Sequence, residues 1–264
     1  MRPIAEAYKD FPILHKEHNG HRVIYLDSGA TAQIPQSVID RVVEHMTQRN
    51  GNPHRGSHIL AIEASEDYEN ARDRVVEFIN AREREEVVFT RNSTESMNLI
   101  AHSYGLHNVK KGDKIVITVA EHHANLVTWQ YVAEQTGATL EYMYLDEHGH
   151  LKDGEINKID EKTKIVAFAH VSNVLGMEFP VKELTEKAHS VGAVVVLDGA
   201  QSTPHKKIDV QELDCDFFVF SGHKMCASQG IGVLYGKREL LEAMPPFLLG
   251  GDMIEYVKEQ TATF

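Results

Sequence analysis

Cysteine is scarce in this chain of 264 residues, where Cys215 and Cys226 are the two examples. Two cysteines are too few for a disulfide framework. Long apolar runs are missing as well, because none approaches the roughly 18 residues that a membrane span requires. The opening MRPIAEAYKDFPIL carries acidic residues where a signal peptide needs an apolar stretch. We therefore expect a soluble, cytoplasmic protein of a reducing compartment, with no membrane partner.

Positive charge is also in short supply. The chain has 27 Lys and Arg against 39 Asp and Glu, a formal net charge of −12. A sequence-independent nucleic-acid binder needs a basic face to neutralise phosphates, so we expect no nucleic-acid partner. A nicotinamide-dependent enzyme is disfavoured because no GxGxxG follows a strand-like run. What the chain does contain is apolar material for a core, since 42% of its residues are hydrophobic.

Strand-like and helix-like patterns alternate after the first eighty residues. Helical patterns at residues 94–104, 125–135 and 181–190 separate apolar strand-like runs at EVVFT, KIVITVA, ATLEYMYLD, KIVAFAHV, AVVVLD, DFFVFSG and GIGVLYG. This alternation predicts an α/β fold with a mostly parallel mixed sheet sandwiched by helices. The last two runs are joined without a helix, so we expect the final strand to be antiparallel.

The chain is expected to divide near residue 50. Residues 1–50 are predicted to form an N-terminal helical arm, and residues 51–264 one large α/β domain. The clearest amphipathic helix is predicted over residues 61–80. Its apolar face is expected to contain Ile62, Tyr68, Val75, Phe78 and Ile79.

Two polar residues follow buried strands, and ligands of parallel sheets bind at the carboxyl ends of strands. Asp198 follows AVVVL, and Lys224 follows FVFSGH. Alone, a strand-end Asp most often caps a helix or forms a turn, and most lysines are solvated surface groups. The functional alternatives are a carboxylate that holds a proton on a ring nitrogen, with Gln201 in reach, and an amine that forms a Schiff base.

Two further clusters carry similar alternatives. Ser93 and Thr94 precede a helical pattern, so they are either part of an ordinary N-cap or hydroxyls that bind phosphate at a helix start. His122 and His123 follow another strand. Adjacent histidines point apart, so a shared metal site is disfavoured and no metal is predicted. A ring that stacks on a flat cofactor and moves a proton is the functional alternative.

Taken together, the amine, the acid, the hydroxyls and the imidazole suit pyridoxal phosphate, which needs one of each. The segments that carry a family resemblance are YLDSGATAQIP, HRGSHILAIEASEDYENAR, FTRNSTESMNLIAHSYG, EHHANLVTWQ, HVSNVLG, VVLDGAQSTPH and FVFSGHKMCASQGIGVLYGKRELLEAM. From about residue 8 to the end, the chain resembles the SufS-type cysteine desulfurases. These belong to the class V branch of fold-type I pyridoxal-phosphate enzymes.

The resemblance implies specific roles. Lys224 would be the Schiff-base lysine, and His123 would stack on the cofactor ring and take part in proton transfer. Other implied cofactor contacts are Ser93, Thr94, Asn173, Asp198, Gln201, Ser221 and His223. Implied substrate contacts are Asn173 and, at an entrance near a dimer interface, Ala30, Thr31, His54 and Arg55. The implied substrate is L-cysteine, and the implied partners are a sulfur-acceptor protein of iron–sulfur assembly and a second subunit.

Three departures from the family pattern qualify these expectations. Asn92 stands where glycine is common, and CASQG follows Lys224 where GPTG is usual. The chain ends at TATF, whereas members continue into a small C-terminal domain with the persulfide-forming cysteine, a carboxylate-binding arginine and a cross-subunit threonine. We expect that domain to be absent from this chain, and Cys226 does not align with the nucleophile.

Alternative functions stay open at this point. Another class V enzyme, such as a selenocysteine lyase, a cysteine-sulfinate desulfinase or an aminotransferase, would share the same cofactor-binding motifs. A non-catalytic fragment that binds pyridoxal phosphate would share them too.

Overall fold

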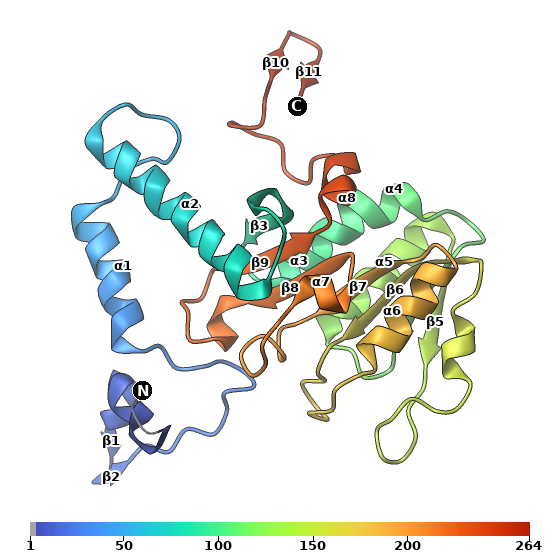
Figure 1. Ribbon diagram of the computed structural model, residues 1–264, viewed down its shortest axis with the longest axis horizontal. Helices are drawn as coiled ribbons and strands as arrows, with labels where there is room; N and C mark the ends of the chain where they lie inside the picture. The colour runs from blue at the N-terminus through green and yellow to red at the C-terminus, as the bar shows by residue number, and fades with distance from the viewer. Residues whose placement is uncertain (1–3) are drawn as a thin grey trace.

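A seven-stranded sheet forms the centre of the molecule in a computed structural model that describes residues 4–264 (Figure 1). The strands are β1 Glu17–His18, β2 His21–Arg22, β3 Val87–Thr90, β4 Lys114–Thr118, β5 Thr139–Met143, β6 Thr163–Ala169, β7 Val194–Asp198, β8 Phe217–Ser221, β9 Gly232–Gly236, β10 Tyr256–Val257 and β11 Ala262–Thr263. The central sheet has the order β3-β9-β8-β7-β6-β4-β5. Only β9 runs antiparallel to its neighbours in this sheet, which confirms the predicted direction of the final strand.

Helices cover both faces of this sheet, so the predicted α/β class is confirmed. The α-helices of six or more residues are α1 Gln36–Gln48, α2 Ile59–Ile79, α3 Ser93–Leu99, α5 Val127–Thr136, α6 Val181–Ser190 and α8 Arg238–Ala243. The other helical segments are η1 Ile4–Asp10, η2 Pro12–His15, η3 Arg84–Glu86, η4 Ile100–Gly105, α4 Leu106–Asn108, η5 His123–Asn125, η6 Glu155–Lys158, α7 Val210–Leu213 and η7 Gly222–Lys224.

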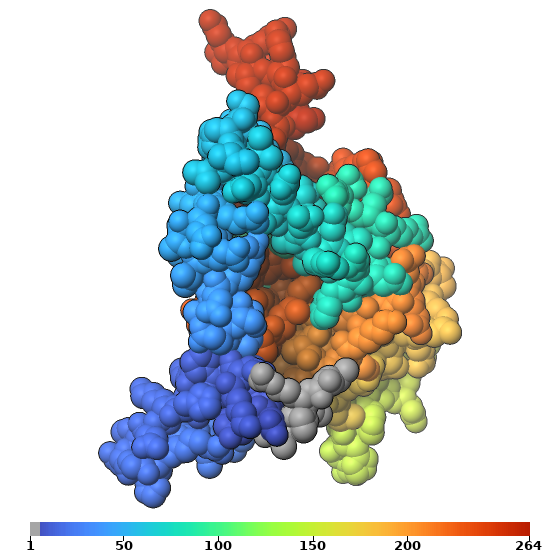
Figure 2. All heavy atoms as spheres, turned by 60° about the vertical axis from the view of Figure 1, so that its left-hand side comes forward, coloured from blue at the N-terminus to red at the C-terminus, as the bar shows by residue number. Residues whose placement is uncertain are grey.

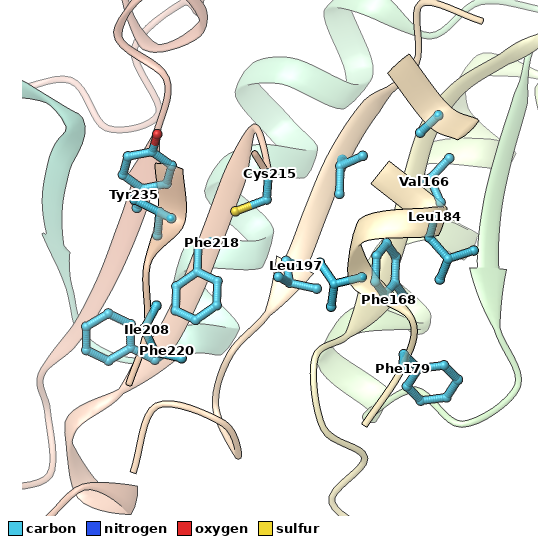
Figure 3. Packing of buried hydrophobic residues seen from close by; sticks show 14 of the residues in the cluster. Val166, Phe168, Phe179, Leu184, Leu197, Ile208, Cys215, Phe218, Phe220 and Tyr235 are labelled. Atoms are coloured by element: carbon cyan, nitrogen blue, oxygen red, sulfur yellow. The ribbon is translucent and has the colours of Figure 1, made fainter. Parts of the chain in front are cut away.

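Alternate residues of the central strands build two separate cores. On β8, Phe217 faces one core together with Trp129 of α5, whereas Phe218 faces the other together with Leu184 of α6. Figure 3 shows Phe218, Phe220, Phe168 and Leu184 on the second face. Because both faces are covered, β8 is buried along its whole length. This explains why its sequence is a continuous apolar run rather than an alternating one.

The N-terminal segment lies beside the sheet and contributes no strand to it. It contains η1, η2, the β1–β2 hairpin and α1. Its atoms form the blue part of the surface on one side of the molecule (Figure 2). The α2 helix confirms the helix predicted over residues 61–80, but the predicted apolar face is wrong in part. Its buried side chains are those of Ala61, Ala64 and Ile79, whereas Ile62, Tyr68 and Phe78 are exposed. The reason is that α2 meets the sheet mainly through its C-terminal end.

Candidate functional site

A cavity of about 660 Å³ lies where the parallel strands end. Its walls come from the turns after β3, β4, β6, β7 and β8, as expected for a sheet of this type. The predicted residues that line it are Ala30, Ser93, Thr94, Asn173, Asp198, Gln201, Ser221, His223 and Lys224. The residues that were not predicted to contact a ligand are Gly29, Arg91, Asn92, His122, Ala169, Val171, Ala200, Gln229 and Gly230.

Asp198 and Lys224 provide the acid and the amine of this cavity. Asp198 ends β7 and is 6% exposed, and its Oδ1 accepts a hydrogen bond of 2.9 Å from the backbone N–H of Ala200. Burial raises the pKa of Asp198, while that hydrogen bond and the nearby Lys224 and His122 act in the opposite direction. Within residues 4–264 the bond from Ala200 is the only hydrogen bond to this carboxylate. The acid therefore keeps accepting capacity for a ligand.

Hydroxyl groups gather where β3 leads into α3. The backbone N–H of Ser93 donates to Ser221 Oγ at 2.9 Å, and the hydroxyls of Ser93 and Ser221 lie 2.8 Å apart. Asn92 caps α3, because its side chain accepts a hydrogen bond of 2.9 Å from Glu95 N. Gly232 of β9 must be glycine here, since a Cβ would lie 2.5 Å from Asn92 Cα. This close approach brings the Ser93 turn onto the end of the sheet.

The N-terminal segment is hydrogen-bonded to the same end of the sheet. Gln201 Nε2 donates to the backbone oxygen of Gly29 at 2.8 Å, and Thr31 Oγ1 donates to His223 O at 3.1 Å. These bonds bring Gly29 and Ala30 into the cavity wall. Thr31 does not line the cavity itself, but its hydroxyl also lies 3.2 Å from His223 Nδ1. The sequence contains no signal for these contacts, because they join residues about 170 to 190 positions apart.

The structure corrects the assignment of the histidine pair, because His122 and not His123 lines the cavity. The two rings diverge, with centroids 6.1 Å apart and planes tilted by 53°. His122 precedes η5, and its Nδ1 accepts a hydrogen bond of 3.1 Å from Ala124 N. Burial lowers the pKa of His122, and Lys224 and His123 add to that effect while Asp198 opposes it. A neutral imidazole therefore faces the cavity near neutral pH.

The structure does not bring His54 and Arg55 to this cavity. His54 Nε2 lies 3.2 Å from Glu69 Oε1, and its backbone N–H donates to Ser65 Oγ at 2.8 Å. Arg55 Nε lies 3.7 Å from Asp252 Oδ1. Both residues precede α2, whose N-terminal end projects away from the sheet (Figure 1). Neither residue lines the cavity of this single chain, and their place at an entrance near a dimer interface stays a prediction.

Neither cysteine is prepared to act as a thiolate. Cys215 is fully buried in the core that Figure 3 shows, and burial raises the pKa of its thiol. Burial likewise raises the pKa of the partly exposed Cys226, which does not line the cavity. Nucleophilic cysteines need the opposite environment, with a lowered pKa.

Four of the unpredicted residues belong to the segments RNST and CASQG, in which the sequence departs from the family pattern. They are Arg91, Asn92, Gln229 and Gly230, and all four line the cavity. Arg91 adds a cation at the rim, where it pairs with Glu95. In the part of the chain that the structure describes, no group of three or more His, Cys, Asp or Glu side chains could hold a metal ion. No helix there is long and apolar enough to cross a bilayer.

The groups in the cavity fit pyridoxal phosphate. Burial raises the pKa of Asp198, and its carboxyl accepts one backbone hydrogen bond. The carboxyl can therefore accept a further hydrogen bond from a protonated ring nitrogen. The hydroxyls of Ser93 and Ser221 lie 2.8 Å apart in the wall of the same cavity and can donate to an anion. Lys224 lines the same cavity with a primary amine. An acid, an amine and anion-binding hydroxyls in one cavity are the set that this cofactor requires.

The sequence is similar to proteins of one known family. The sequence profile of the family "Aminotransferase class-V" matches residues 24–264. A probable cysteine desulfurase of Synechocystis sp. is 51% identical over 255 residues, which are 96% of this chain and 60% of that protein. A probable cysteine desulfurase of Staphylococcus aureus is 51% identical over 99% of this chain and 63% of that protein. The chain thus spans about 60% of the length of these relatives.

Two solved structures share the fold. The cysteine desulfurase CsdA from Escherichia coli superposes with a TM-score of 0.89 at 40% identity, over 100% of this chain and 65% of that one. The cysteine desulfurase from Thermococcus onnurineus superposes with a TM-score of 0.93 at 40% identity, over 100% and 64%. The chain therefore belongs to the class-V aminotransferase family of pyridoxal-phosphate enzymes.

Proposed function

We propose that the protein is a cysteine desulfurase, which removes sulfur from L-cysteine. The observation that carries the proposal is the cavity in which the Lys224 amine, the buried Asp198 and the Ser93 and Ser221 hydroxyls converge. Relatives named probable cysteine desulfurase, at 51% and 53% identity, support the same substrate. The overall reaction breaks the Cβ–S bond of L-cysteine, leaves L-alanine and converts an acceptor thiol into a persulfide.

The cofactor supplies, when bound, a ring that withdraws electrons from the Cα of an attached amino acid. Lys224 is proposed to carry the cofactor through its amine and, once released, to move a proton at Cα. Asp198 is proposed to hold a proton on the ring nitrogen of the cofactor. A buried carboxylate stabilises a cation beside it, so it would raise the pKa of that nitrogen. His122 is proposed to take the ring-facing role first assigned to His123, since its imidazole lines the cavity.

The remaining residues are proposed to bind and orient. Ser93, Thr94, Ser221 and His223 would hold the phosphate, because they line one part of the cavity with hydroxyl and imidazole groups. Gln201 and Asn173 would contact the ring hydroxyl and the substrate carboxylate. Ala30 would line the substrate side of the cavity, and Thr31 would act through its contact with His223. Fixing reactants in one geometry can account for several powers of ten in rate.

The thiol that receives sulfur is proposed to be neither Cys215 nor Cys226. Burial raises the pKa of both thiols, so neither is a thiolate near neutral pH. The proposed destination of the sulfur is an acceptor protein of iron–sulfur cluster assembly. We further propose that residues 51–264 are the cofactor-binding domain, that residues 1–50 are an arm, and that the protein is a homodimer. Apolar side chains that α1 exposes support the last proposal: Ile39, Val42, Val43 and Met46.

The test is the Lys224→Ala variant, studied beside Lys162→Ala, which changes an exposed lysine away from the cavity. With pyridoxal phosphate added, the wild-type protein and Lys162→Ala should show a visible absorption band and a borohydride-reducible lysine adduct. Lys224→Ala should lose both, together with any release of alanine from cysteine. An unchanged band and adduct in Lys224→Ala would refute the assignment of the lysine. Cofactor attachment without alanine release in the whole protein would refute the desulfurase activity.

A further inference from the structure

Glu121 is a buried carboxyl that lies directly behind the cavity and does not line it. Its Oε1 lies 2.5 Å from Thr118 Oγ1, and its Oε2 accepts a hydrogen bond of 2.6 Å from Asn125 Nδ2. Asn125 Oδ1 in turn accepts a hydrogen bond of 2.8 Å from Trp129 Nε1. These four residues form a continuous chain of hydrogen bonds, here called the Glu121 network, from the end of β4 into α5.

The Glu121 network spans the turn that carries His122. Thr118 ends β4, and Asn125 ends η5, so the network closes the turn on both sides of the imidazole. The ladder between β4 and β6 ends at Ile117 and Ala167. Beyond it, the backbone of Ala169 forms a hydrogen bond with the Glu121 carboxyl instead. Ala169 is the β-sheet partner of Asp198, so Glu121 joins the His122 turn to the strand beside the buried acid.

The surroundings of the Glu121 carboxyl favour its neutral form. Burial raises its pKa to about 8, while the hydrogen bonds from Thr118, Asn125 and Ala169 oppose that effect. Asp198 from β7 faces it as a second acid and raises the pKa further. The titratable groups beyond Asp198 are those of His122 and Lys224, which interact with the Asp198 carboxyl. Thr118 Oγ1 donates to Oε1 and Asn125 Nδ2 donates to Oε2, so both oxygens of the carboxyl accept a hydrogen bond. A protonated carboxyl keeps both contacts, because the Thr118 hydroxyl can also accept a hydrogen bond.

We propose that Glu121 is a positioning residue for His122, which holds the imidazole in the cavity wall through the Glu121 network. A buried network of this kind is stiff when all of its members are paired and becomes costly when one member is removed. Loss of the carboxyl would leave Asn125 Nδ2 and the backbone of Ala169 without this acceptor, and the Thr118 hydroxyl would keep its contact with the Ala120 N–H but lose the group to which it donates. The turn would then relax, and His122 would leave its desolvated position. The inference rests on the proposed cofactor cavity but not on the reaction carried out there.

The experiment compares Glu121→Ala with Glu121→Gln in the cofactor-free protein. Glutamine has the shape of a neutral carboxyl and can donate to Thr118 while it accepts from Asn125. NMR titration of the His122 ring, assigned by its loss in His122→Gln, reports the position of the imidazole without any catalysis. Thr118→Val removes a single member of the network, and it decides the question if Glu121→Ala does not fold.

The matched control is Glu86→Ala, which removes another buried glutamate. Glu86 is 4% exposed and accepts a hydrogen bond of 2.8 Å from Arg82 N, and it does not line the cavity. This variant should lose thermal stability, as any unpaired buried group predicts. It should leave the titration of His122 unchanged. A purely structural role for Glu121 would make the two alanine variants behave alike.

The proposal expects Glu121→Ala and Thr118→Val to raise the pKa of His122 by about 0.5 unit or more, since a released ring regains water. Both should bind pyridoxal phosphate about tenfold more weakly, the effect of one lost buried hydrogen bond. Glu121→Gln should match the wild type in both measurements. The proposal is overturned if the His122 titration does not move in the folded variants, if Glu121→Gln moves it as far as Glu121→Ala, or if Glu86→Ala moves it equally. Failure of the desulfurase assay alone would leave these titrations standing.

Discussion

Two aspartates at opposite ends of neighbouring strands in the sheet are equally buried but have different hydrogen-bond and ion-pair partners. Asp198 ends β7, Asp216 precedes β8, and each is 6% exposed. Asp216 Oδ2 accepts from Val195 N at 2.7 Å and lies 2.9 Å from His189 Nε2, while its Oδ1 lies 2.9 Å from Lys237 Nζ. Asp198 has one backbone hydrogen bond and, in the part of the chain that the structure describes, no ion pair.

The difference in partners distinguishes a carboxylate that stabilises the fold from a carboxylate that is available to a ligand. At the amino ends of the parallel strands, Asp216 forms an ion pair with Lys237, which follows β9, and contacts His189 of α6, so it joins these elements. At the carboxyl edge, Asp198 faces a cavity, and burial raises its pKa because its compensation within the chain is incomplete. A buried charge that the chain does not pair costs stability. The incomplete pairing of Asp198 therefore points to a ligand that completes it.

The largest expected effect concerns activity at Asp198. Asp198→Asn should lower turnover by about 100-fold or more, because a neutral amide cannot stabilise a protonated ring nitrogen. Its free energy of unfolding should change by less than about 1 kcal/mol or even rise, since asparagine still accepts from Ala200 N and removes a desolvated charge. Alanine release from cysteine and urea unfolding measure the two quantities. A stability loss as large as that of the Asp216 variant would end the distinction between the two aspartates.

The next largest effect is expected on stability at Asp216, where cofactor binding should be preserved. Asp216→Asn should lower the free energy of unfolding by about 2 to 3 kcal/mol, because Lys237 and His189 lose their shared carboxylate. Urea unfolding measures the change. Cofactor absorbance should be preserved at low denaturant, since this edge lies away from the cavity. Asp214→Asn is the control, because Asp214 also lies near Lys237 but its side chain is 61% exposed. Equal losses in both variants would contradict a special role for burial.

A smaller effect is expected on the pH dependence of unfolding, which the buried Glu121 carboxyl near the carboxyl ends of the strands should influence. Burial raises the pKa of Glu121 from 4.5 to about 8. The folded protein then binds this proton more tightly than the unfolded chain does. Its contribution to stability is complete below pH 4.5 and is lost as the pH rises through 8. Glu121→Gln should therefore unfold with a shallower pH dependence than the wild type, and the difference should amount to about 1 to 2 kcal/mol between pH 6.5 and 8. Chemical denaturation at several pH values tests this, and parallel profiles would contradict it.

The smallest effect is expected where charge is neither buried nor near the cavity. Arg74 NH1 lies 2.8 Å from Glu77 Oε2 on the outer side of α2, with side chains 80% and 66% exposed. Water screens such pairs, and their median contribution is close to zero. Arg74→Ala should change Tm by no more than about 1 °C. A shift of several degrees would show that pairing alone, without burial, stabilises this protein.

Much of the fold follows from patterns that are local in the sequence. The seven strands of the central sheet match seven apolar runs, because strands covered on both faces need apolar residues at consecutive positions. The cavity residues Asp198, Ser221 and Lys224 could be predicted for a related reason. Each follows a buried strand, and the carboxyl ends of parallel strands meet at one edge of the sheet. Position relative to a strand was enough to find them.

Only the tertiary structure decided the features that depend on direction or on distant partners. The sequence presents His122 and His123 as equivalents, and the turn closed by Glu121 and Asn125 selects His122 for the cavity. Only the structure shows that Arg55, which precedes α2, lies 3.7 Å from Asp252 and outside the wall of the cavity. In the sequence, Glu121 is one acidic residue after a strand. Its burial and its neutral carboxyl arise from packing against β6 and β7, because desolvation depends on what surrounds a group in space.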